Sequence, residues 1–367
     1  MVGAGPGGLL SSYALLRKGF RTEVHEEHDR VGLPRHCSGL VSEYVVRTLG
    51  SLAKPHVLSK FNEYRVRTLE DGLIHDASTL RFREPVYLVD RVEFEASLSE
   101  VVESCGGRLV LRSRITDLNT EQAAVKTRQG WRRGDLLIIS EGAARSLVSE
   151  AGLCVGGKSL VGPQALVRLG RAPETVEVMV SPIFGSEGFG WVIPVDDRRA
   201  IVGLLTSSRM AGNMLRYLIR KIARHSYEAV VERFFGGTVP ADRPCKNLVS
   251  RKYLVVGDAA SLTKPITKGG LYPLVEEVRA LGDSVRSDGL NVDVFNFRYR
   301  GILRLINSQH RMLDVICRLG GYYKLVKSIT RPGLKDLRLL NYDKLLPDPS
   351  SLLPAYTLKK LLGLPDY

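Results

Sequence analysis

Hydrophobic residues in the first 150 positions form short apolar runs that alternate with segments of helical spacing. The runs at 22–26 and 136–139 are typical of buried strands, whereas residues 9–18 and 92–104 have the periodicity of helices. Residues 108–118 also resemble a strand. Strands that alternate with helices favour a mostly parallel sheet with helices on both faces. The sequence therefore predicts an α/β, doubly wound, Rossmann-like domain.

The pattern changes to a period of two between Val161 and Gly203. Residues 175–180 and 200–205 alternate between apolar and polar positions, with Gly, Pro and Asp turns between such segments. Residues 64–80 alternate in the same way and are expected to join them. The pattern predicts an inserted antiparallel sheet, followed by a helical C-terminal region in which 295–319 is the longest helix.

A glycine-rich turn, Gly3-Ala4-Gly5-Pro6-Gly7-Gly8, precedes the first predicted helix. Gly3 would permit a tight turn, Gly5 would let the backbone approach a pyrophosphate, and Gly8 would let the helix pack closely on the sheet. Glu26 follows Gly5 by 21 residues, where a carboxylate would bind a ribose. The helix N-terminus would attract the phosphates. The pattern predicts a bound adenine dinucleotide.

A second strand, turn and helix start covers residues 253–271, with Asp258 in the turn and Gly269-Gly270-Leu271 at the helix start. Asp258 could accept hydrogen bonds from ribityl hydroxyls of a flavin. The N–H groups near Gly270 and Leu271 could face the pyrimidine end of the isoalloxazine and stabilise negative charge there. An ordinary turn with an aspartate cap is the alternative.

With these motifs the chain resembles FAD-dependent oxidoreductases of the para-hydroxybenzoate hydroxylase fold. Within them it resembles the archaeal geranylgeranyl reductases, which saturate the isoprenoid chains of membrane lipids. The narrower resemblance depends on Pro-Arg-His-Cys-Ser-Gly at 34–39 and Gly-Phe-Gly-Trp-Val-Ile-Pro at 188–194. Arg91 lies where the family has an arginine near the cofactor. The resemblance extends to about residue 330 and implies that the cofactor is FAD.

The resemblance implies a discontinuous FAD-binding domain interrupted by a substrate domain. We expect the FAD-binding domain at 1–60, 85–155 and 245–290, the β substrate domain at 61–84 and 156–244, and the helical region at 291–367. Two departures from the family stand out. Glu141 replaces an aspartate of the family, which puts a cofactor contact there in doubt. Only two residues precede Gly3, so we expect the natural protein to extend upstream.

The implied reaction is hydride transfer from flavin N5 to an isolated C=C bond, with a proton added to the adjacent carbon. Positive charge would develop, so the site should be dry and aromatic. Phe189, Trp191 and Tyr272 are the candidate substrate walls. Cys37 is the first candidate for a positioning or relay role, and His36 is the alternative titrating group. The residues expected to bind the cofactor are Gly3, Gly5, Gly7, Gly8, Glu26, Cys37, Ser38, Gly39, Arg91, Ile115, Asp258, Gly270 and Leu271.

Composition changes this picture in a few respects. The net charge of +14 favours an acidic partner, and an anionic lipid surface fits better than nucleic acid because no nucleic-acid motif is present. The five cysteines lack metal-ligand spacing, so we expect reduced thiols and no metal. No apolar run is long enough to span a membrane. Leucines at 352–364 around Lys359 and Lys360 could lie in a membrane interface or pack on the protein.

Three alternatives remain open from sequence. A flavin monooxygenase or halogenase would share the fold, although halogenases usually carry Trp-x-Trp-x-x-Pro where this chain has Phe189-Gly190-Trp191. A quinone-linked dehydrogenase of this fold often has a terminal four-cysteine cluster, which is missing from this sequence. A non-catalytic lipid- or flavin-binding protein would show no turnover. The electron donor would be NAD(P)H or an acidic ferredoxin, and we expect a cytoplasmic, peripherally membrane-associated enzyme.

Overall fold

The computed structural model describes residues 1–154, 157–226, 228–330 and 336–347. The chain divides into two compact units. Unit 1 consists of residues 1–57, 89–161 and 235–313, and unit 2 consists of residues 58–88, 162–234 and the described residues from Asp314 on. None of the described helices is long and apolar enough to cross a membrane. The leucine-rich segment at 352–364 lies outside the described residues.

A parallel sheet forms the centre of unit 1. Its order is β5 (Arg108–Val110), β1 (Glu23–His25), the single residue Val2, β9 (Leu137–Ile139) and β15 (Tyr253–Val255), and every neighbouring pair is parallel. Val24, Ile138 and Leu254 are completely buried, as expected for strands covered on both faces. The doubly wound architecture predicted from the sequence is confirmed.

Unit 1 contains the helices α1 (Pro6–Leu16), α3 (Arg91–Ser104) and α6 (Leu271–Ser284). Helix α1 packs against both α3 and α6. It begins three residues before the predicted start at Leu9, because Pro6 has no N–H to satisfy and its fixed φ suits the first helical position. Asp90 caps α3 by accepting hydrogen bonds from the N–H groups of Val92 and Glu93.

The strand predicted at 108–118 is interrupted. Strand β5 ends at Val110 and β6 begins at Asp117, because Arg112 has a left-handed φ of 52° that breaks the extended conformation. Strand β6 then forms a three-stranded antiparallel sheet with β7 and β8. Further strands and α-helices that lie wholly or mostly in unit 1 are β2 (Leu40–Ser42), α2 (Glu43–Leu49), β6 (Asp117–Asn119), β7 (Ala124–Thr127), β8 (Gly130–Arg133), α4 (Ser146–Glu150), β16 (Val285–Arg286), β17 (Gly289–Leu290) and α7 (Val292–Arg318).

A large mixed sheet forms unit 2. Its strand order is β14, β10, β13, β12, β11, β3, β4, β18 and β19. Strands β10 to β13 pair antiparallel, whereas β11 pairs parallel with β3 and β18 pairs parallel with β4. The bounds are β3 (Val57–Glu70), β4 (Leu73–Val89), β10 (Ser159–Leu169), β11 (Val176–Val180), β12 (Phe189–Pro194), β13 (Arg199–Leu205), β14 (Ala229–Pro240), β18 (Asp336–Asn341) and β19 (Leu346–Pro347).

The alternating segment at 64–80, predicted to join the antiparallel sheet, is part of a hairpin. Asp71 and Gly72 form the turn between β3 and β4, with φ values of 49° and 76°. Two successive left-handed residues are typical of the type I′ turn that matches the twist of paired strands. The Asp-Gly pair therefore marks a reversal inside the segment.

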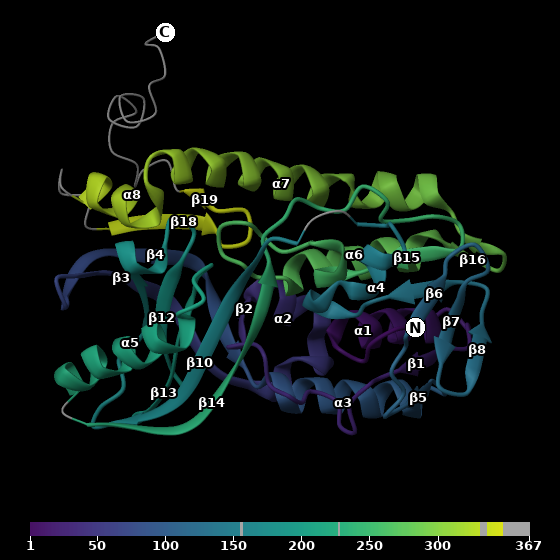
Figure 1. Ribbon diagram of the computed structural model, residues 1–367, viewed down its shortest axis with the longest axis horizontal. Helices are drawn as coiled ribbons and strands as arrows, with labels where there is room; N and C mark the ends of the chain where they lie inside the picture. Colours follow the sequence, from purple (N-terminus) through teal and green to yellow (C-terminus); the bar gives the residue numbers. More distant parts are fainter. Residues whose placement is uncertain (155–156, 227, 331–335, 348–367) are drawn as a thin grey trace, which may run out of the picture. The chain divides into compact units, whose positions relative to one another are not determined.

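Helix α5 (Ala211–Ser226) covers one face of the sheet of unit 2 and provides its core. Leu215, Leu218, Ile219 and Ile222 pack with buried residues of β10, β11, β12 and β13. Figure 1 shows α5 alongside β12 and β13. The long helix predicted at 295–319 is α7, and α8 (Gly321–Thr330) follows it.

Candidate active site

The glycine-rich turn of unit 1 combines close packing with an open cradle. A Cβ atom on Gly3, whose φ is 85°, would lie 2.5 Å from the carbonyl oxygen of Ser140, and one on Gly8 would lie 2.0 Å from that of Gly3. Gly5 is the N-cap of α1, and nothing lies within 4 Å of its Cβ position. The turn therefore leaves space beside Gly5, where N–H groups of the helix N-terminus can meet an anion.

Glu26 meets this turn at the end of β1. Its Oε2 accepts a hydrogen bond of 2.8 Å from the N–H of Ala4. Its Oε1 accepts one of 3.0 Å from the N–H of His28 and lies 2.6 Å from His28 Nδ1. A carboxylate oxygen has two lone pairs, so Glu26 retains capacity for a hydroxyl ligand. Sequence spacing did not indicate His28, which orients this carboxylate.

Arg91, at the start of α3, connects the cysteine loop with the second motif. Its Nη2 donates a 2.5 Å hydrogen bond to Glu95 Oε1, while its Nε is buried and has no hydrogen-bond partner among the described residues. Burial acts to lower the pKa of Arg91, but Glu95, Cys37 and Asp258 together raise it above its usual value. A buried donor without a partner fits a polar atom of a bound cofactor.

Asp258 lies in the turn after β15, next to the start of α6. Burial raises its pKa, and the nearby Arg91 acts in the opposite direction. A Cβ on Gly270 would lie 3.1 Å from Asp258 Oδ1, so the two residues predicted to contact the flavin are neighbours. Leu271 begins the helix directly after Gly270.

Glu277 is a residue of this site that the sequence did not reveal. It is completely buried, and its Oε2 accepts a 2.9 Å hydrogen bond from the N–H of Gly257. Burial raises the pKa of Glu277 to about 8, although the bond from Gly257 opposes this shift. Its position on the mostly apolar, buried face of α6 was the available indication.

The loop at 34–39 is held by backbone contacts around Cys37. Arg35 Nε donates to the carbonyl oxygen of Cys37 at 3.4 Å and Nη2 to that of Ser38 at 3.5 Å, while its guanidinium lies 4.7 Å from the ring centre of Phe235. Gly39, with φ of 100°, accepts a hydrogen bond from the N–H of Val89. Cys37 is a half-buried free thiol that interacts electrostatically with Arg91.

The remaining predicted residues have defined surroundings. His36 Nδ1 lies 3.0 Å from the carbonyl oxygen of Gly236. Ile115 is buried, two residues after Ser113, whose N–H donates to the carbonyl oxygen of Glu26. A Cβ on Gly7 would lie 3.2 Å from the side chain of Ser140. These residues therefore belong to the same unit as the glycine-rich turn and Asp258.

The aromatic candidates fall into two groups. In unit 2, the ring centres of Phe189 and Trp191 are 5.8 Å apart, and Tyr322 packs edge-on to Phe189. Tyr322 was not indicated by the sequence. In unit 1, Tyr272 packs edge-on to Tyr44, and the ammonium group of Lys264 lies 5.9 Å from the centre of its ring.

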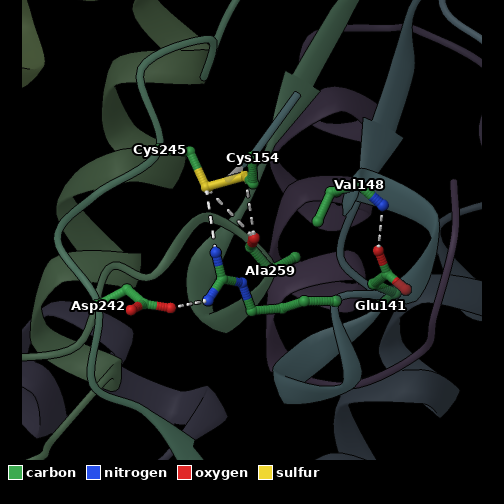
Figure 2. Close-up of a disulfide and its surroundings, with 7 residues drawn as sticks. Glu141, Val148, Cys154, Asp242, Cys245 and Ala259 are labelled. Atoms are coloured by element: carbon green, nitrogen blue, oxygen red, sulfur yellow. Dashed lines mark hydrogen bonds and ion pairs between the residues drawn. A yellow bond between two sulfur atoms is a disulfide. The ribbon is translucent and has the colours of Figure 1, made fainter. Parts of the chain in front are cut away.

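Glu141, at the point where the chain departs from the family pattern, serves the fold. Its two oxygens accept hydrogen bonds from the N–H groups of Leu147 and Val148, at 3.0 and 2.7 Å, at the start of α4. Figure 2 shows the bond to Val148. Both carboxylate oxygens thus accept hydrogen bonds within the protein.

The expectation that all five cysteines are reduced is wrong for two of them. Cys154 and Cys245 form a disulfide between segments separated by 91 residues (Figure 2). Their sulfur atoms lie 3.6 and 3.8 Å from the carbonyl oxygen of Ala259, next to Asp258. The pairing was invisible in the sequence because only the fold brings the two Cα atoms to 5.0 Å.

No family model matches the chain. It is 25% identical to a digeranylgeranylglycerophospholipid reductase from Methanothrix thermoacetophila over 78% of this chain and 76% of that protein. It is 21% identical to one from Methanocella arvoryzae over 99% of this chain and 98% of that protein.

Solved structures show the same fold at lower identity. A geranylgeranyl bacteriochlorophyll reductase-like protein from Thermoplasma acidophilum has a TM-score of 0.77 and 17% identity, covering 98% of this chain and 94% of that one. A p-nitrophenol 4-monooxygenase from Pseudomonas putida has a TM-score of 0.68 and 14% identity, covering 90% of this chain and 95% of that one. The resemblance inferred from the motifs is confirmed: the chain is similar in sequence to digeranylgeranylglycerophospholipid reductases and shares its fold with a geranylgeranyl bacteriochlorophyll reductase-like protein and a probable FAD-dependent monooxygenase.

Proposed function

We propose that the protein is an FAD-dependent reductase that saturates C=C bonds of geranylgeranyl chains in membrane lipids or their precursors. The observation that carries the proposal is the grouping of Cys37, Arg91 and Asp258, in which the buried Arg91 Nε has no hydrogen-bond partner in the described part of the chain. The names of the relatives supply the substrate class. Bound FAD would supply the hydride from its N5 atom.

Residues of unit 1 would hold the two ends of FAD. The open backbone at Gly5 and the N-terminus of α1 would bind the pyrophosphate, and Glu26 would accept hydrogen bonds from the ribose of the adenosine. Asp258 would bind ribityl hydroxyls, and Arg91 Nε would donate to a cofactor oxygen or nitrogen. The glycines at 3, 7 and 8 keep the turn compact.

Cys37 would position the alkene or relay a proton. It stands in the loop that interacts with Arg91, whereas His36 Nδ1 faces the carbonyl oxygen of Gly236. A neutral thiol is a weak acid toward an alkene, so Cys37 is assigned a positioning or relay role. Phe189, Trp191 and Tyr272 are proposed to contact the isoprenoid chain, because aromatic faces tolerate developing positive charge.

The decisive experiment is anaerobic mixing of the FAD-loaded, dithionite-reduced protein with a geranylgeranyl glycerophospholipid. Reoxidation of the flavin, together with a lipid whose mass has increased by two hydrogens per reduced bond, is the expected result. A reduced flavin that stays reduced, with unchanged lipid, would leave a binding protein without turnover. A protein that takes up no FAD would exclude every flavin-dependent function.

A flavin monooxygenase or halogenase is the second candidate, because a monooxygenase and a flavin-dependent brominase share the fold. The brominase has a TM-score of 0.65 with 14% identity. Under this alternative the reduced protein would react with O₂ and modify an aromatic substrate, while prenyl lipid would be left unchanged. Product analysis after exposure to each substrate separates the two functions.

The positive net charge of the protein bears on its electron donor and on its contact with the membrane. Electrons would come from transiently bound NAD(P)H or from an acidic ferredoxin, whose charge complements a protein of net charge +14. The same charge would attract the protein to an anionic lipid surface, where its substrate is found. We therefore propose a cytoplasmic enzyme that associates peripherally with the membrane.

A further inference from the structure

A completely buried carboxyl group holds the turn that carries Asp258. Glu277, on helix α6, is 0% exposed, and its Oε2 accepts a 2.9 Å hydrogen bond from the N–H of Gly257. The carbonyl oxygens of Gly257 and Asp258 accept bonds from residues further along the chain, and these bonds close the turn. Glu277 instead holds the N–H with which the turn begins.

The neighbours of Gly257 and Glu277 also support the glycine-rich turn. A Cβ atom on Gly7 would lie 3.3 Å from Val256 Cγ1 and 3.8 Å from Leu274 Cδ1. Val256 directly precedes Gly257, and Leu274 lies about one helical turn before Glu277. The elements that carry Gly257 and Glu277 therefore also pack on the turn that is proposed to bind the pyrophosphate.

The surroundings of Glu277 favour a neutral carboxylic acid. Within the described residues its Oε1 has no hydrogen-bond partner, so a single N–H would have to stabilise an ionised carboxylate. A buried charge with so few partners is costly, and the phosphates of a bound FAD would repel it further. Burial raises the pKa of Glu277 to about 8, although the bond from Gly257 opposes this shift, which agrees with the geometry.

Titratable groups on the neighbouring elements give an ionised Glu277 little support. Burial raises the pKa of Tyr299, on α7, well above its usual value, and the charge of Glu277 adds to this shift. Asp258, whose pKa burial raises and Arg91 lowers, would add a second negative charge when ionised. Helix α1, which packs against α6 and is described in full, contains no charged residue and has Tyr13 as its titratable side chain.

We propose that Glu277 is a positioning residue for FAD: its protonated carboxyl group holds Gly257 so that Asp258 meets the ribityl chain, and its ionisation weakens cofactor binding. This inference rests on the proposed function, because it requires FAD to lie at the Asp258 turn. Glu277 acts through the turn and through its charge, without touching the cofactor. The affinity for FAD should therefore depend on the protonation of Glu277.

Fluorescence titration of the flavin-free protein with FAD at pH 7 and pH 9 provides the test. If FAD binds tightly to the protein with a neutral Glu277 alone, the wild-type dissociation constant should rise about tenfold between these pH values. Glu277→Gln keeps the acceptor for the Gly257 N–H and cannot ionise. It should bind FAD at pH 7 within about threefold of the wild type, and equally well at pH 9.

Two further variants define the outcome. Glu277→Leu leaves the Gly257 N–H without its acceptor and should weaken FAD binding about tenfold or more at pH 7. Glu276→Gln, the matched control, removes the neighbouring carboxyl group, which bonds to Arg279, and should keep the wild-type pH dependence.

The pH profiles separate this inference from the proposed function. A wild-type affinity that is equal at pH 7 and pH 9 would overturn the role of Glu277 while leaving FAD binding intact. A tenfold change that persists in Glu277→Gln would assign the titration to another group, such as Asp258, and would overturn it as well. Failure of the wild type to bind FAD would overturn both proposals.

A measurement on the wild type alone covers the case in which the Glu277 variants do not fold. At pH 9 the flavin-free protein has mostly lost the Glu277 proton, so FAD binding should take up close to one proton. Calorimetric titration in two buffers that differ in ionisation enthalpy counts this proton. FAD binding without proton uptake at pH 9 would contradict the coupling between Glu277 and the cofactor.

Discussion

Gly5 and Gly8 belong to one turn but have different surroundings. Substitutions at these two positions should therefore affect cofactor binding and folding differently. Nothing lies within 4 Å of the Cβ position of Gly5, whereas a Cβ on Gly8 would lie 2.0 Å from the Gly3 carbonyl oxygen. Gly5→Ala should therefore change the stability of the FAD-free protein by less than about 1 kcal/mol and weaken FAD binding at least tenfold, because the methyl group occupies the phosphate cradle.

Gly8→Ala is the matched comparison for Gly5→Ala. The overlap with the backbone of Gly3 should lower the melting temperature of the FAD-free protein itself. Thermal melting without FAD and fluorescence titration with FAD measure the two effects. A Gly5→Ala variant that binds FAD as tightly as the wild type would show that the pyrophosphate does not lie at this turn.

Cys37 is the residue whose chemistry is most directly testable. Cys37→Ala should retain FAD yet lose much of its alkene reduction. The loop should keep its structure, because it is held by hydrogen bonds from the Arg35 guanidinium to backbone carbonyl oxygens and by the bond from Val89 to Gly39. Cys105→Ala, which removes an exposed free thiol, is the control and should behave like the wild type. Single-turnover reduction of prenyl lipid, with bound flavin counted by absorbance, is the measurement. Full turnover by Cys37→Ala would remove the thiol from the mechanism.

Glu277 should make folding stability depend on pH. Its pKa is about 8 in the folded protein, against 4.5 as the ordinary value. Between these values the folded chain keeps a proton that the unfolded chain has released, so stability falls as the pH rises from 4.5 to 8. The slope contributed by one group is at most about 1.4 kcal/mol per pH unit. Glu277→Gln cannot ionise and should lose this slope.

Urea denaturation at pH 5 and pH 8 tests the Glu277 prediction. The difference in unfolding free energy between the two pH values should be smaller in Glu277→Gln than in the wild type by about 1 kcal/mol or more. This energy corresponds to a difference of about one pKa unit for Glu277 between the folded and the unfolded protein. Glu103→Gln, at an exposed position of α3, should keep the wild-type difference. Identical profiles for all three proteins would show that Glu277 does not titrate in this range.

These residues also show what sequence can predict about a site. Gly3, Gly8 and Glu26 were predicted because their spacing along one strand, turn and helix fixes their geometry, and the bond from Ala4 to Glu26 joins them. His28 was missed although it contacts Glu26 from only two residues away, because the spacing of residues does not show the turn that joins them. Glu277 was missed because its role depends on a contact that the fold creates. A buried Glu277 could be suspected from its place on an apolar helix face, but its partner Gly257 could not.

At the scale of elements, the periodicity of the sequence predicted whether a segment is a helix or a strand better than it predicted where the segment begins and ends. The helix α3 was predicted to within one residue of its start, because Asp90 is a strong N-cap followed by a regular apolar face. The prediction of one strand at 108–118 was wrong at Arg112, because an arginine in the sequence does not indicate a left-handed backbone conformation. The hairpin turn at Asp71-Gly72 was present in the sequence, but the long alternation on both sides concealed it.

The Cys154–Cys245 disulfide joins two loop segments of unit 1 and should stabilise the fold. Closing a loop between residues 91 positions apart is worth about 4.5 kcal/mol in the chain-entropy description. Cys154→Ala combined with Cys245→Ala should therefore lower the unfolding free energy by several kcal/mol, measured by urea denaturation without reductant. Cys105→Ala should have little effect, because that thiol is exposed and free.

Counting thiols gives an independent check on this disulfide. Alkylation of the denatured, unreduced wild-type protein should modify three of the five cysteines, Cys37, Cys105 and Cys317. Modification of all five would show that the pair is reduced in solution, and the double variant should then be as stable as the wild type within the cost of two small buried substitutions.

At the scale of the whole molecule, the net charge of +14 is distributed so that one helix presents a basic stripe. Arg216, Arg220 and Arg224 are exposed at successive turns of α5, and the helix contains no acidic residue. Its opposite face is buried in the core of unit 2. A helix whose apolar side is already packed can contact a membrane only through its polar side, so this stripe would act by charge.

The stripe on α5 therefore gives a prediction for membrane binding. The protein should bind vesicles that contain phosphatidylglycerol, fail to bind neutral phosphatidylcholine vesicles, and dissociate at high salt. Replacing the three arginines by glutamine should weaken binding at least tenfold, because each basic residue near an anionic surface contributes about 1 kcal/mol. The control replaces the exposed Arg128, Arg132 and Arg133, around β8, and removes the same net charge. Equal losses of vesicle binding in both triple variants would show that total charge, rather than this helix, attracts the protein to the lipid. Salt-resistant binding to neutral vesicles would contradict an electrostatic contact.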